Sequence, residues 1–537
     1  MSKRREIVFL LILVCIALII RLIISSHVLI SRDSLLYLEL AEKIGQGQLS
    51  LNRPLSLQNL IQPGYSITIF IFNLLVRNWE LAGLLVSLMS GLFSVVLVYY
   101  LSKELFNYRL GILASLIVTI YPCFINYSTI ILTESLFALF FLGIVYYFWI
   151  ITKRNKPYYH YILLGLIIGF SYLIRVTGLF ALAAIIVWIL VNWLIRKKIN
   201  YKQVVTSIIL VIIGASLFVT PYLAFLYQKK HNFLIAGAQD YVVFAKNNLE
   251  DGAFSRLEKN RIYKSLNDDK NDYKINNLNT NELKTQLSIG SLITTYIKNF
   301  FRNISYNARY FLFAFLVIIP FIAYGLIRSI KHKERFAGYC YIISWVIFIM
   351  LIYYTGRPLI RYYYPAIPLL LILAADGITG LTTKLRLKPI RLYVMTTIII
   401  ITVMYNFLSN ALPGYFDYRL KFFNLFRTDS NKYREIGQWI NKNSSENPKI
   451  LSTSPKVSYY AKAVHYPIPF ADCESILDFV RYQKINFILL LDNDIDNLCD
   501  ASRFAKIPYE KIKQYNIEII YKGSDFSLFE AVYNYSS

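Results

Sequence analysis

Cysteine is scarce in this chain, which has five in 537 residues. The five are scattered through the sequence, and none has the spacing of a metal-binding motif. Cys473 and Cys499 fall in the same C-terminal part of the chain. They could pair there if that part faces an oxidising compartment, or remain as two free thiols. Cysteine usage therefore predicts no metal centre.

Acidic residues are also few, with 32 Asp and Glu against 57 Lys and Arg, which gives a net charge of +25. A charge of this size is typical of proteins that bind nucleic acid. Here, however, most basic residues fall in short segments between apolar runs, where they set orientation in a membrane. We therefore expect no nucleic-acid partner. The C-terminal part also lacks a glycine-rich phosphate motif, so nucleotide binding is not expected there.

Long apolar runs dominate the sequence, which is 56% hydrophobic with a mean hydropathy of +0.45. Because about 20 apolar residues cross a roughly 30 Å hydrocarbon core, we predict about eleven spans. They lie near 7–30, 79–101, 109–125, 131–151, 159–174, 177–195, 203–227, 308–328, 336–355, 359–379 and 391–411. The first begins like a signal peptide but is too long and lacks a small-residue cleavage site. We interpret it as a retained anchor.

Charge bias predicts the orientation of these spans. With the N-terminus in the cytoplasm, the short segments on that side carry twenty basic residues, and the opposite short loops carry seven. Cytoplasmic loops hold the excess of Lys and Arg in membrane proteins. We therefore predict a multi-pass protein of the plasma (inner) membrane, with a cytoplasmic N-terminus and an extracytoplasmic C-terminal part.

One apolar segment, "GYSITIFIFNLL" at 64–75, is too short to be an ordinary span. Counting it as a span would also place the later basic clusters outside the cell. An interfacial or re-entrant helix is therefore favoured over a span.

The predicted fold class is a polytopic α-helical membrane protein with a small C-terminal extracytoplasmic α/β domain. The transmembrane domain covers 1–411, with a first external loop at 31–63 that holds an interfacial helix and a large external loop at 229–307. The second domain covers 412–537. In it "KYREIGQWINKN" predicts a helix, and "KILSTS", "NFILLLD", "IEIIYKG" and "FSLFEAVY" predict strands. A further helix, "DCESILDFVRYQ", is expected between the first two strands.

Two acidic residues lie at the external mouths of spans. Asp33 begins the amphipathic segment "SRDSLLYLELAEKIGQG", with Tyr37 and Ala41 on the same helical face. Asp33 or Ser34 could simply cap that helix. Glu134 starts the fourth span, where the helix dipole alone would favour a carboxylate. A charge at this depth is nevertheless costly unless it faces water or a partner, so both acids are candidate site residues.

Three arginines lie on the same predicted side. Arg175 follows a span in "SYLIRVTGLF", where it could also reach out to lipid headgroups. Arg357 and Arg361 lie in "YYTGRPLIRYYYPAIPLLL", where a helix is expected to start at Pro358 or, alternatively, at Pro365. Arginine at the start of a helix favours phosphate binding. The tyrosines from Tyr362 onward could equally form only an aromatic belt.

These segments resemble the GT-C glycosyltransferases, in particular the protein O-mannosyltransferases and the lipid A aminoarabinose transferases. The similarity rests on an Asp followed by "LLYLELA", on "IILTES", "IRVTGL" and "RYYYPAIP", and on the C-terminal sequence from "REIGQWINKN" to "NFILLLD". The chain departs from the family at "IQPGY", where many members have His-Pro-Pro. It also has Ser34 where many have a second acid.

The resemblance implies an inverting transfer from a polyprenyl-phosphate sugar to an acceptor hydroxyl on a protein, lipid or glycan. It implies Asp33 as general base, Glu134 as an orienting acid, and Arg361 with Arg357 or Arg175 as stabilisers of the departing phosphate. Tyr37 and Tyr362 are further expected substrate-binding residues. No cofactor or metal is required by this scheme.

Two alternatives remain. A transporter or flippase of lipid-linked sugars would need polar groups at the bilayer midplane and internal repeats, but the spans are almost free of charge apart from Arg21. An O-antigen-ligase-like enzyme would place its catalytic residues in the large loop, which contains His231, Arg256 and Arg302.

Overall fold

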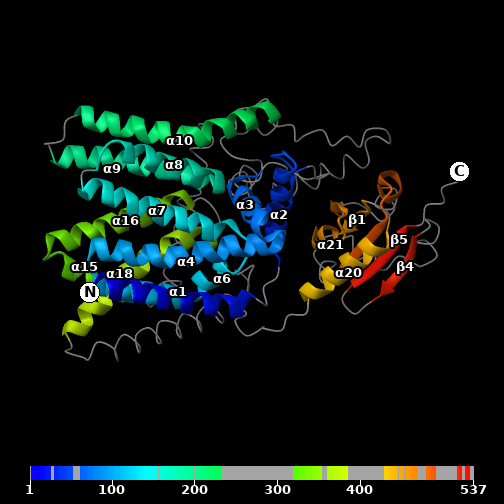
Figure 1. Cartoon of the computed structure of the whole chain (residues 1–537), viewed down its shortest axis with the longest axis horizontal. Helices are drawn as coiled ribbons and strands as arrows, with labels where there is room; N and C mark the ends of the chain where they lie inside the picture. Colours follow the sequence, from blue (N-terminus) through cyan, green and yellow to red (C-terminus); the bar gives the residue numbers. More distant parts are fainter. Residues whose placement is uncertain are drawn as a thin grey trace, which may run out of the picture.

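The structure is a computed structural model. It describes residues 2–25, 30–51, 61–154, 156–196, 201–230, 318–353, 360–384, 429–444, 447–452, 455–467, 479–491, 517–522 and 526–531 (Figure 1). The predicted span 391–411 lies outside these residues. So does the external loop 229–307, apart from its first two residues.

A bundle of roughly parallel and antiparallel helices forms most of the described chain (Figure 1). The long helices are α1 (Lys3–Ser25), α4 (Trp79–Leu105), α7 (Thr133–Arg154), α8 (Tyr159–Ile174), α9 (Phe180–Arg196), α10 (Tyr201–Lys230), α16 (Lys333–Tyr353) and α18 (Ile367–Lys384). Shorter elements are α5 (Tyr108–Ile120), α6 (Pro122–Ser128), η1 (Val176–Leu179), α15 (Ile319–Ser329), α17 (Ile360–Tyr363) and η2 (Tyr364–Ala366). Every predicted span up to residue 379 overlaps one of these helices. Within the described residues, six helices are long and apolar enough to cross a membrane, or seven if the pair α5 and α6 counts as one span.

The span expected at 109–125 is broken in the structure. Helices α5 and α6 meet at an angle of 63°. Pro122 starts α6, and it has no N–H with which to continue α5. Tyr121, the residue before it, is extended, with φ −69° and ψ 118°, as a following proline favours. Pro122 thus explains why a continuous apolar run contains two helices.

Two short helices lie across one end of the bundle (Figure 1). They are α2 (Arg32–Gly45) and α3 (Gly64–Val76). A reciprocal capping box starts α2: the Ser31 hydroxyl accepts from the Ser34 N–H at 3.0 Å, and the Ser34 hydroxyl accepts from the Ser31 N–H at 3.1 Å. With 13 residues, α3 is shorter than a bilayer-spanning helix, as predicted.

Glycines bring α8 and α10 into close contact. A Cβ added at Gly165 would lie 2.2 Å from the Val211 carbonyl oxygen, and one at Gly214 would lie 2.2 Å from the Ile162 carbonyl oxygen. Small residues allow helix backbones to approach in this way within membranes, where dispersion contacts replace the hydrophobic effect. This packing fixes α8, whose C-terminal end leads into Arg175.

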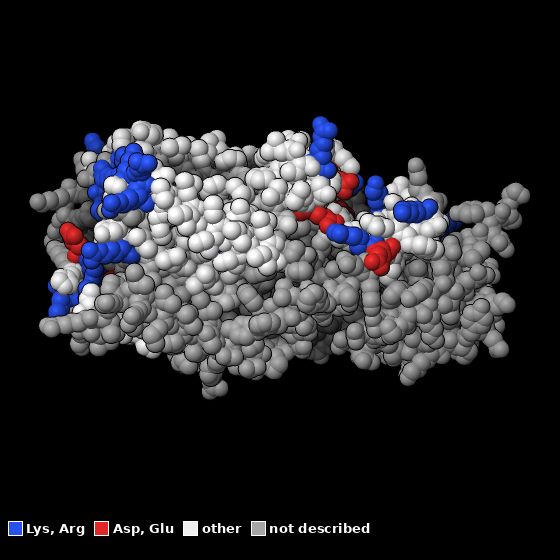
Figure 2. All heavy atoms as spheres, turned by 60° about the horizontal axis from the view of Figure 1, so that its bottom comes forward, with Lys and Arg blue, Asp and Glu red and all other residues white. Residues whose placement is uncertain are grey.

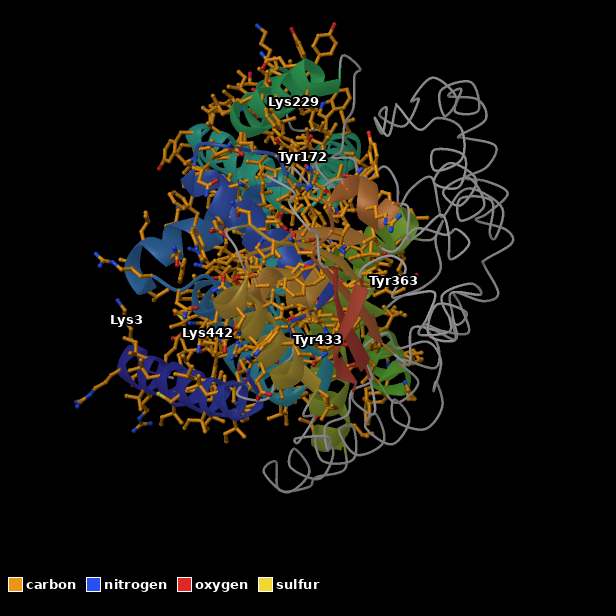
Figure 3. The ribbon with its side chains drawn as sticks, turned by 90° about the vertical axis from the view of Figure 1, so that its right-hand side faces the viewer. Lys3, Tyr172, Lys229, Tyr363, Tyr433 and Lys442 are labelled. Atoms are coloured by element: carbon orange, nitrogen blue, oxygen red, sulfur yellow. The ribbon has the colours of Figure 1, made fainter. Side chains whose placement is uncertain are left out.

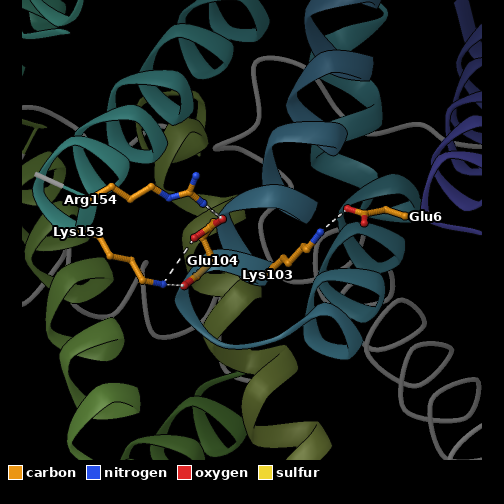
Figure 4. Close-up of polar contacts among 5 residues, drawn as sticks. All are labelled: Glu6, Lys103, Glu104, Lys153 and Arg154. Carbon is orange, nitrogen blue, oxygen red and sulfur yellow. Dashed lines mark hydrogen bonds and ion pairs between the residues drawn. The ribbon is translucent and has the colours of Figure 1, made fainter. Parts of the chain in front are cut away.

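Ion pairs hold together the end of the bundle that lies away from α2 and α3 (Figure 4). Lys103 Nζ lies 2.6 Å from Glu6 Oε1, which joins α4 to α1. Glu104 accepts from Arg154 at 2.5 Å and lies 3.5 Å from Lys153, which joins α4 to α7. Lys and Arg gather at this end of the molecule (Figure 2). The sequence predicts the same unequal distribution of Lys and Arg between the two ends of the spans.

The C-terminal part contains a five-stranded sheet in the order β2-β1-β3-β5-β4. Its elements are α20 (Asp429–Asn443), β1 (Lys449–Ser452), α21 (Pro455–Tyr460), β2 (Val464–Pro467), β3 (Phe487–Leu491), β4 (Ile517–Lys522) and β5 (Phe526–Ala531). Strands β2, β1 and β3 are parallel, whereas β5 is antiparallel to both β3 and β4. The predicted helix 432–443 lies within α20, and the four predicted strands match β1, β3, β4 and β5. Helix α21 and strand β2 were not predicted.

Helices α20 and α21 overlie the bundle in the end-on view of Figure 3, and α21 contacts α2. Arg434 Nη2 in α20 lies 2.6 Å from Glu80 Oε2 in α4. Tyr459 in α21 packs against the hydrophobic cluster that contains Tyr65 and Ile69 of α3. Burial raises the pKa of the neighbouring Tyr460 hydroxyl to about 12, although its hydrogen bond with Arg434 acts in the opposite direction.

Candidate active site

Glu134 and Arg175 form an ion pair at the end of the bundle where α2 and α3 lie. Arg175 Nη1 is 3.1 Å from Glu134 Oε1. Glu134 is in the first turn of α7, and Arg175 directly follows α8. The Glu134 side chain is only 4% exposed and that of Arg175 only 17%. The structure thus brings together two residues that the sequence placed only on the same side of the membrane.

A tight turn fixes the direction of Arg175. Arg175 is extended, with φ −148° and ψ 137°, and its N–H donates to the Ser171 carbonyl at 3.0 Å. Its own carbonyl accepts from the Gly178 N–H at 2.8 Å. A Cβ at Gly178 would lie 2.5 Å from the Ser171 carbonyl carbon, so this close return requires glycine. The segment "IRVTGL" therefore turns the chain so that Arg175 reaches α7 rather than pointing only to the headgroups.

Hydrogen bonds fix the start of α7, where Glu134 lies. The Ser135 hydroxyl donates to the Ser87 carbonyl of α4 at 2.8 Å. The Ser87 hydroxyl in turn shares a 2.7 Å hydrogen bond with the hydroxyl of Tyr65, the second residue of α3. Buried hydroxyls are thus satisfied by partners on three helices. This network holds Glu134 in a largely apolar surrounding, where its charge is compensated by Arg175.

Two aromatic rings flank the Arg175 guanidinium. Its Cζ lies 5.8 Å from the ring centroid of Phe137 and 5.9 Å from that of Tyr362. Arginine is attracted to aromatic faces at such distances. Tyr362 belongs to α17, and Arg361 lies beside it in the same helical turn. The predicted residues Glu134, Arg175 and Tyr362 therefore lie at one place.

The start of α3 packs against the chain that leads to Arg175. A Cβ at Gly64 would lie 2.6 Å from the Leu173 carbonyl carbon and 2.7 Å from the Ile174 nitrogen. Beside it, the Gln62 side-chain amide donates to the Tyr172 carbonyl at 3.1 Å. The segment "IQPGY", which departs from the family pattern, thus contacts the last turn of α8. Gln62 and Gly64 are functional-site neighbours whose positions the sequence did not predict.

Helix α2 carries Asp33 and Tyr37 to the same end of the bundle. The Tyr37 and Tyr65 rings are edge-to-face with centroids 5.3 Å apart, and the Ser66 hydroxyl donates to the Tyr37 carbonyl at 2.9 Å. Asp33 lies in the first turn of α2 and is half-buried. Since Ser31 and Ser34 cap this helix, Asp33 does not occupy the capping position that one interpretation gave it.

Several predicted residues lie beyond what the structure describes. Arg357 is outside the described residues, as are His231, Arg256 and Arg302 of the alternative loop site. The backbone of Arg361 is described in α17, so the helical turn comes after Pro358 and before Pro365. Among the described residues no group of three or more His, Cys, Asp and Glu has the arrangement of a metal site.

Comparison with known proteins identifies the type of fold. Residues 62–218 match the family model for dolichyl-phosphate-mannose-protein mannosyltransferase. No curated protein sequence matches the chain. The solved structure of ArnT from Cupriavidus metallidurans, bound to undecaprenyl phosphate, is similar with a TM-score of 0.57 and 11% identity over 99% of both chains. The oligosaccharyltransferase AglB from Archaeoglobus fulgidus, in complex with an inhibitory peptide and a dolichol-phosphate, is similar with a TM-score of 0.57 and 11% identity over 91% of this chain and 70% of that chain.

The matched segment 62–218 contains Glu134, Arg175 and the start of α3, so the family pattern covers the ion pair and its supports. The structural similarity extends over nearly the whole chain, including the C-terminal part. The chain is therefore a multi-pass membrane protein with the fold of the GT-C glycosyltransferases.

Proposed function

We propose that this protein transfers a sugar from a polyprenyl-phosphate donor to an acceptor hydroxyl at the extracytoplasmic face of the membrane, with inversion at the anomeric carbon. The observation that carries this proposal is the buried Glu134–Arg175 pair, flanked by Tyr362, inside the segment that matches a mannosyltransferase family. The undecaprenyl phosphate of ArnT and the dolichol-phosphate of AglB support a lipid-linked donor.

In the proposed reaction Asp33 is the general base. Its carboxylate takes the proton of the acceptor hydroxyl while the hydroxyl oxygen attacks the anomeric carbon. The bond between that carbon and the phosphate oxygen breaks, and the electron pair leaves with the polyprenyl phosphate. Helix α2 supports this role because Tyr37, one turn after Asp33, is fixed against Tyr65.

The proposed stabilisers of the departing phosphate are arginines. Arg361 lies in the turn that also carries Tyr362, and Arg357 precedes it in the sequence. Arg175 is paired with Glu134, so its part is to set the local charge and to orient Glu134, which in turn orients the sugar or acceptor. Positive groups placed where negative charge develops lower the barrier in a water-poor site. The departing group is a stabilised phosphate, so the scheme requires no metal.

The domain division into 1–411 and 412–537 and the orientation of the chain belong to the same proposal. The basic end of the bundle would face the cytoplasm, and α2, α3 and the C-terminal sheet would lie outside (Figure 2). A donor embedded in the outer leaflet would then present its sugar at the membrane surface beside α2.

The direct test uses purified protein in nanodiscs with radiolabelled polyprenyl-phosphate sugars and, in turn, hydroxyl acceptors on a peptide, a lipid and a glycan. Transfer of label with formation of free polyprenyl phosphate is the expected result. Anomeric proton couplings of the product are expected to show the configuration opposite to that of the donor. Retained configuration would overturn the inverting scheme. If every lipid donor is stable while the protein binds it, a transport role becomes the better account.

A further inference from the structure

Arg21 is a charged residue buried inside a membrane-spanning helix, and the proposed reaction does not use it. It lies in α1 and is completely buried. Burying a guanidinium within a span costs several kcal/mol unless it finds partners, so such residues usually have a role. None of the ion pairs within the described residues includes Arg21. Its hydrogen bonds go to neutral groups instead.

The contacts of Arg21 lead to the break between α5 and α6. Arg21 Nε donates to the Ser128 hydroxyl at 2.8 Å, and Nη1 donates to the Ala17 carbonyl at 3.1 Å and the Thr119 carbonyl at 3.4 Å. Thr119 lies in the last turn of α5, just before the bend, and Ser128 is the last residue of α6. One guanidinium thus holds both sides of the break, which uses the planar, multi-donor geometry of arginine.

Helix α4 leaves room for this arrangement. A Cβ at Gly91 would lie 2.5 Å from Ser128 Cβ and 3.3 Å from Arg21 Nε. Any larger residue at position 91 would push α6 away from α4. Arg21, Ser128 and Gly91 therefore form a close-packed junction of α1, α4 and α6.

Tyr364 connects this junction to the candidate active site. Its ring stacks on Phe124 of α6 with centroids 4.9 Å apart and meets Tyr127 edge-on at 5.0 Å. Its hydroxyl donates to the Phe124 carbonyl of α6 at 3.5 Å. Tyr364 directly follows α17, the turn that carries Arg361 and Tyr362, and it begins η2, which packs against α7.

We propose that Arg21 is a positioning residue which, through Ser128 and Tyr364, sets the spacing between the Glu134 end of α7 and the α17 turn. The reaction affected is the glycosyl transfer proposed above, so this inference rests on the proposed function. The geometric consequence for α6, α7 and α17 does not depend on that function. Arg21 touches neither donor nor acceptor in this scheme. Its fixed charge and its three hydrogen bonds hold α6 in place, and α6 in turn positions the start of α7 and the α17 turn.

The activity-independent test is hydrogen–deuterium exchange of the full-length protein in nanodiscs, comparing wild type with Arg21→Met and Arg21→Lys. In Arg21→Met we expect faster exchange in 119–135 and 360–366, with 333–345 unchanged. Arg21→Lys keeps the charge but loses the planar guanidinium with its several donors. It should therefore show a smaller increase in exchange rate in the same segments. Unchanged exchange, or an increase spread evenly over all helices, would overturn the proposal.

The kinetic test separates positioning from donor binding. In Arg21→Met we expect single-turnover transfer to fall about 10- to 100-fold, as for other small misplacements of reacting groups, with donor affinity within about threefold of wild type. Tyr364→Phe should cause a similar loss, and the double variant should be no worse than the worse single variant, because both act along one path. Additive losses, or a loss confined to donor affinity, would contradict the role assigned to Arg21.

A matched control for Tyr364→Phe exists at the other end of the bundle. The Tyr339 hydroxyl donates to the Leu373 carbonyl at 3.2 Å and to Asp376 Oδ2 at 3.1 Å, and the side chain is fully buried. Tyr339→Phe removes an equally buried hydroxyl, but transfer should stay within about twofold of wild type, as expected for a site remote from the chemistry. If wild type shows no transfer, the proposed function fails. The exchange pattern still decides the role of Arg21.

Discussion

Arg175 Nη1 and Glu134 Oε1 lie 3.1 Å apart, although Glu134 belongs to α7 and Arg175 follows α8, and both are largely shielded from solvent. Each residue stabilises the other, because either charge without its partner would be buried and would carry an uncompensated desolvation cost. The pair also fixes the relative position of the ends of α7 and α8. Among the described residues proposed to contact substrate, Glu134 and Arg175 lie at these two ends, Asp33 and Tyr37 in α2, and Arg361 and Tyr362 in α17.

Removal of Arg175 should destabilise the protein more than removal of both charges. Arg175→Met leaves the Glu134 carboxylate without its ion-pair partner, which costs about 3–5 kcal/mol for a buried pair. Because Arg175 is 17% exposed, we expect the lower end of that range. The double variant Arg175→Met/Glu134→Gln should recover most of the melting temperature in nanodiscs while transfer stays low. A double variant less stable than Arg175→Met would show that the charges do not compensate each other.

Gly64 should tolerate no side chain, whereas Gly143 should tolerate one. A Cβ at Gly64 would lie 2.6 Å from the backbone of Leu173, so Gly64→Ala must push α3 away from α8. Overpacking of this kind costs about 1–3 kcal/mol. At Gly143 in α7 the nearest atom to an added Cβ is Leu97 Cδ1 at 4.0 Å, and alanine also favours helix. Thermal unfolding followed by tryptophan fluorescence should show a lower midpoint for Gly64→Ala and an equal or higher one for Gly143→Ala.

Arg361→Ala should weaken use of the donor more than it weakens the fold. The residue lies in the α17 turn beside Tyr362, whose ring faces Arg175. Losing one charged contact to a phosphate should reduce donor affinity or transfer about 10- to 100-fold, which corresponds to about 1.4–2.8 kcal/mol. Equilibrium binding of a labelled polyprenyl-phosphate sugar measures the first quantity, and single-turnover transfer measures the second. Unchanged values for both would remove Arg361 from the phosphate site.

The C-terminal domain should lie outside the cytoplasm. The reason is the excess of basic residues at the bundle end opposite α2 and α3 (Figure 2). Alkaline phosphatase fused after Ser537 should be active, and green fluorescent protein at the same point should be dark. The reverse pattern would place the proposed site on the cytoplasmic face and would rule out the extracytoplasmic reaction.

The helices were predictable from the sequence because each long span is an apolar run, and basic residues mark one of its ends, as in the last turns of α4 and α7. The break before Pro122 was missed because the residues around it are mostly apolar, and a proline in a first helical turn resembles one at a kink. Strand β2 was missed because "VHYP" has only four residues and ends in proline.

The site was predictable in composition but not in its contacts. Sequence placed Glu134 and Arg175 on one side of the membrane, yet their pairing depends on the turn at Gly178, a tertiary feature with no periodic signal. Arg21 stood out as the charge inside a span, but its link to Tyr364, which runs through Ser128 and Phe124 of α6, joins residues more than 300 positions apart. Such a long-range contact leaves no local pattern in one sequence.

Asp33 is the residue on which the proposed chemistry depends most. It lies at the head of α2, a helix that is already capped by Ser31 and Ser34. Asp33→Asn is nearly isosteric and should therefore change stability by less than about 1 kcal/mol. A matched control is Glu39→Gln, an equally conservative change two turns further along α2.

The most direct measurement is single-turnover transfer by Asp33→Asn in nanodiscs, with donor binding measured separately on the same preparation. We predict a rate about 10²- to 10⁴-fold below wild type, the usual contribution of a positioned general base, with donor affinity and melting temperature preserved. Glu39→Gln should transfer at a rate near that of wild type. Near-normal transfer by Asp33→Asn would contradict the assignment of Asp33 as the base and would shift that role to Glu134.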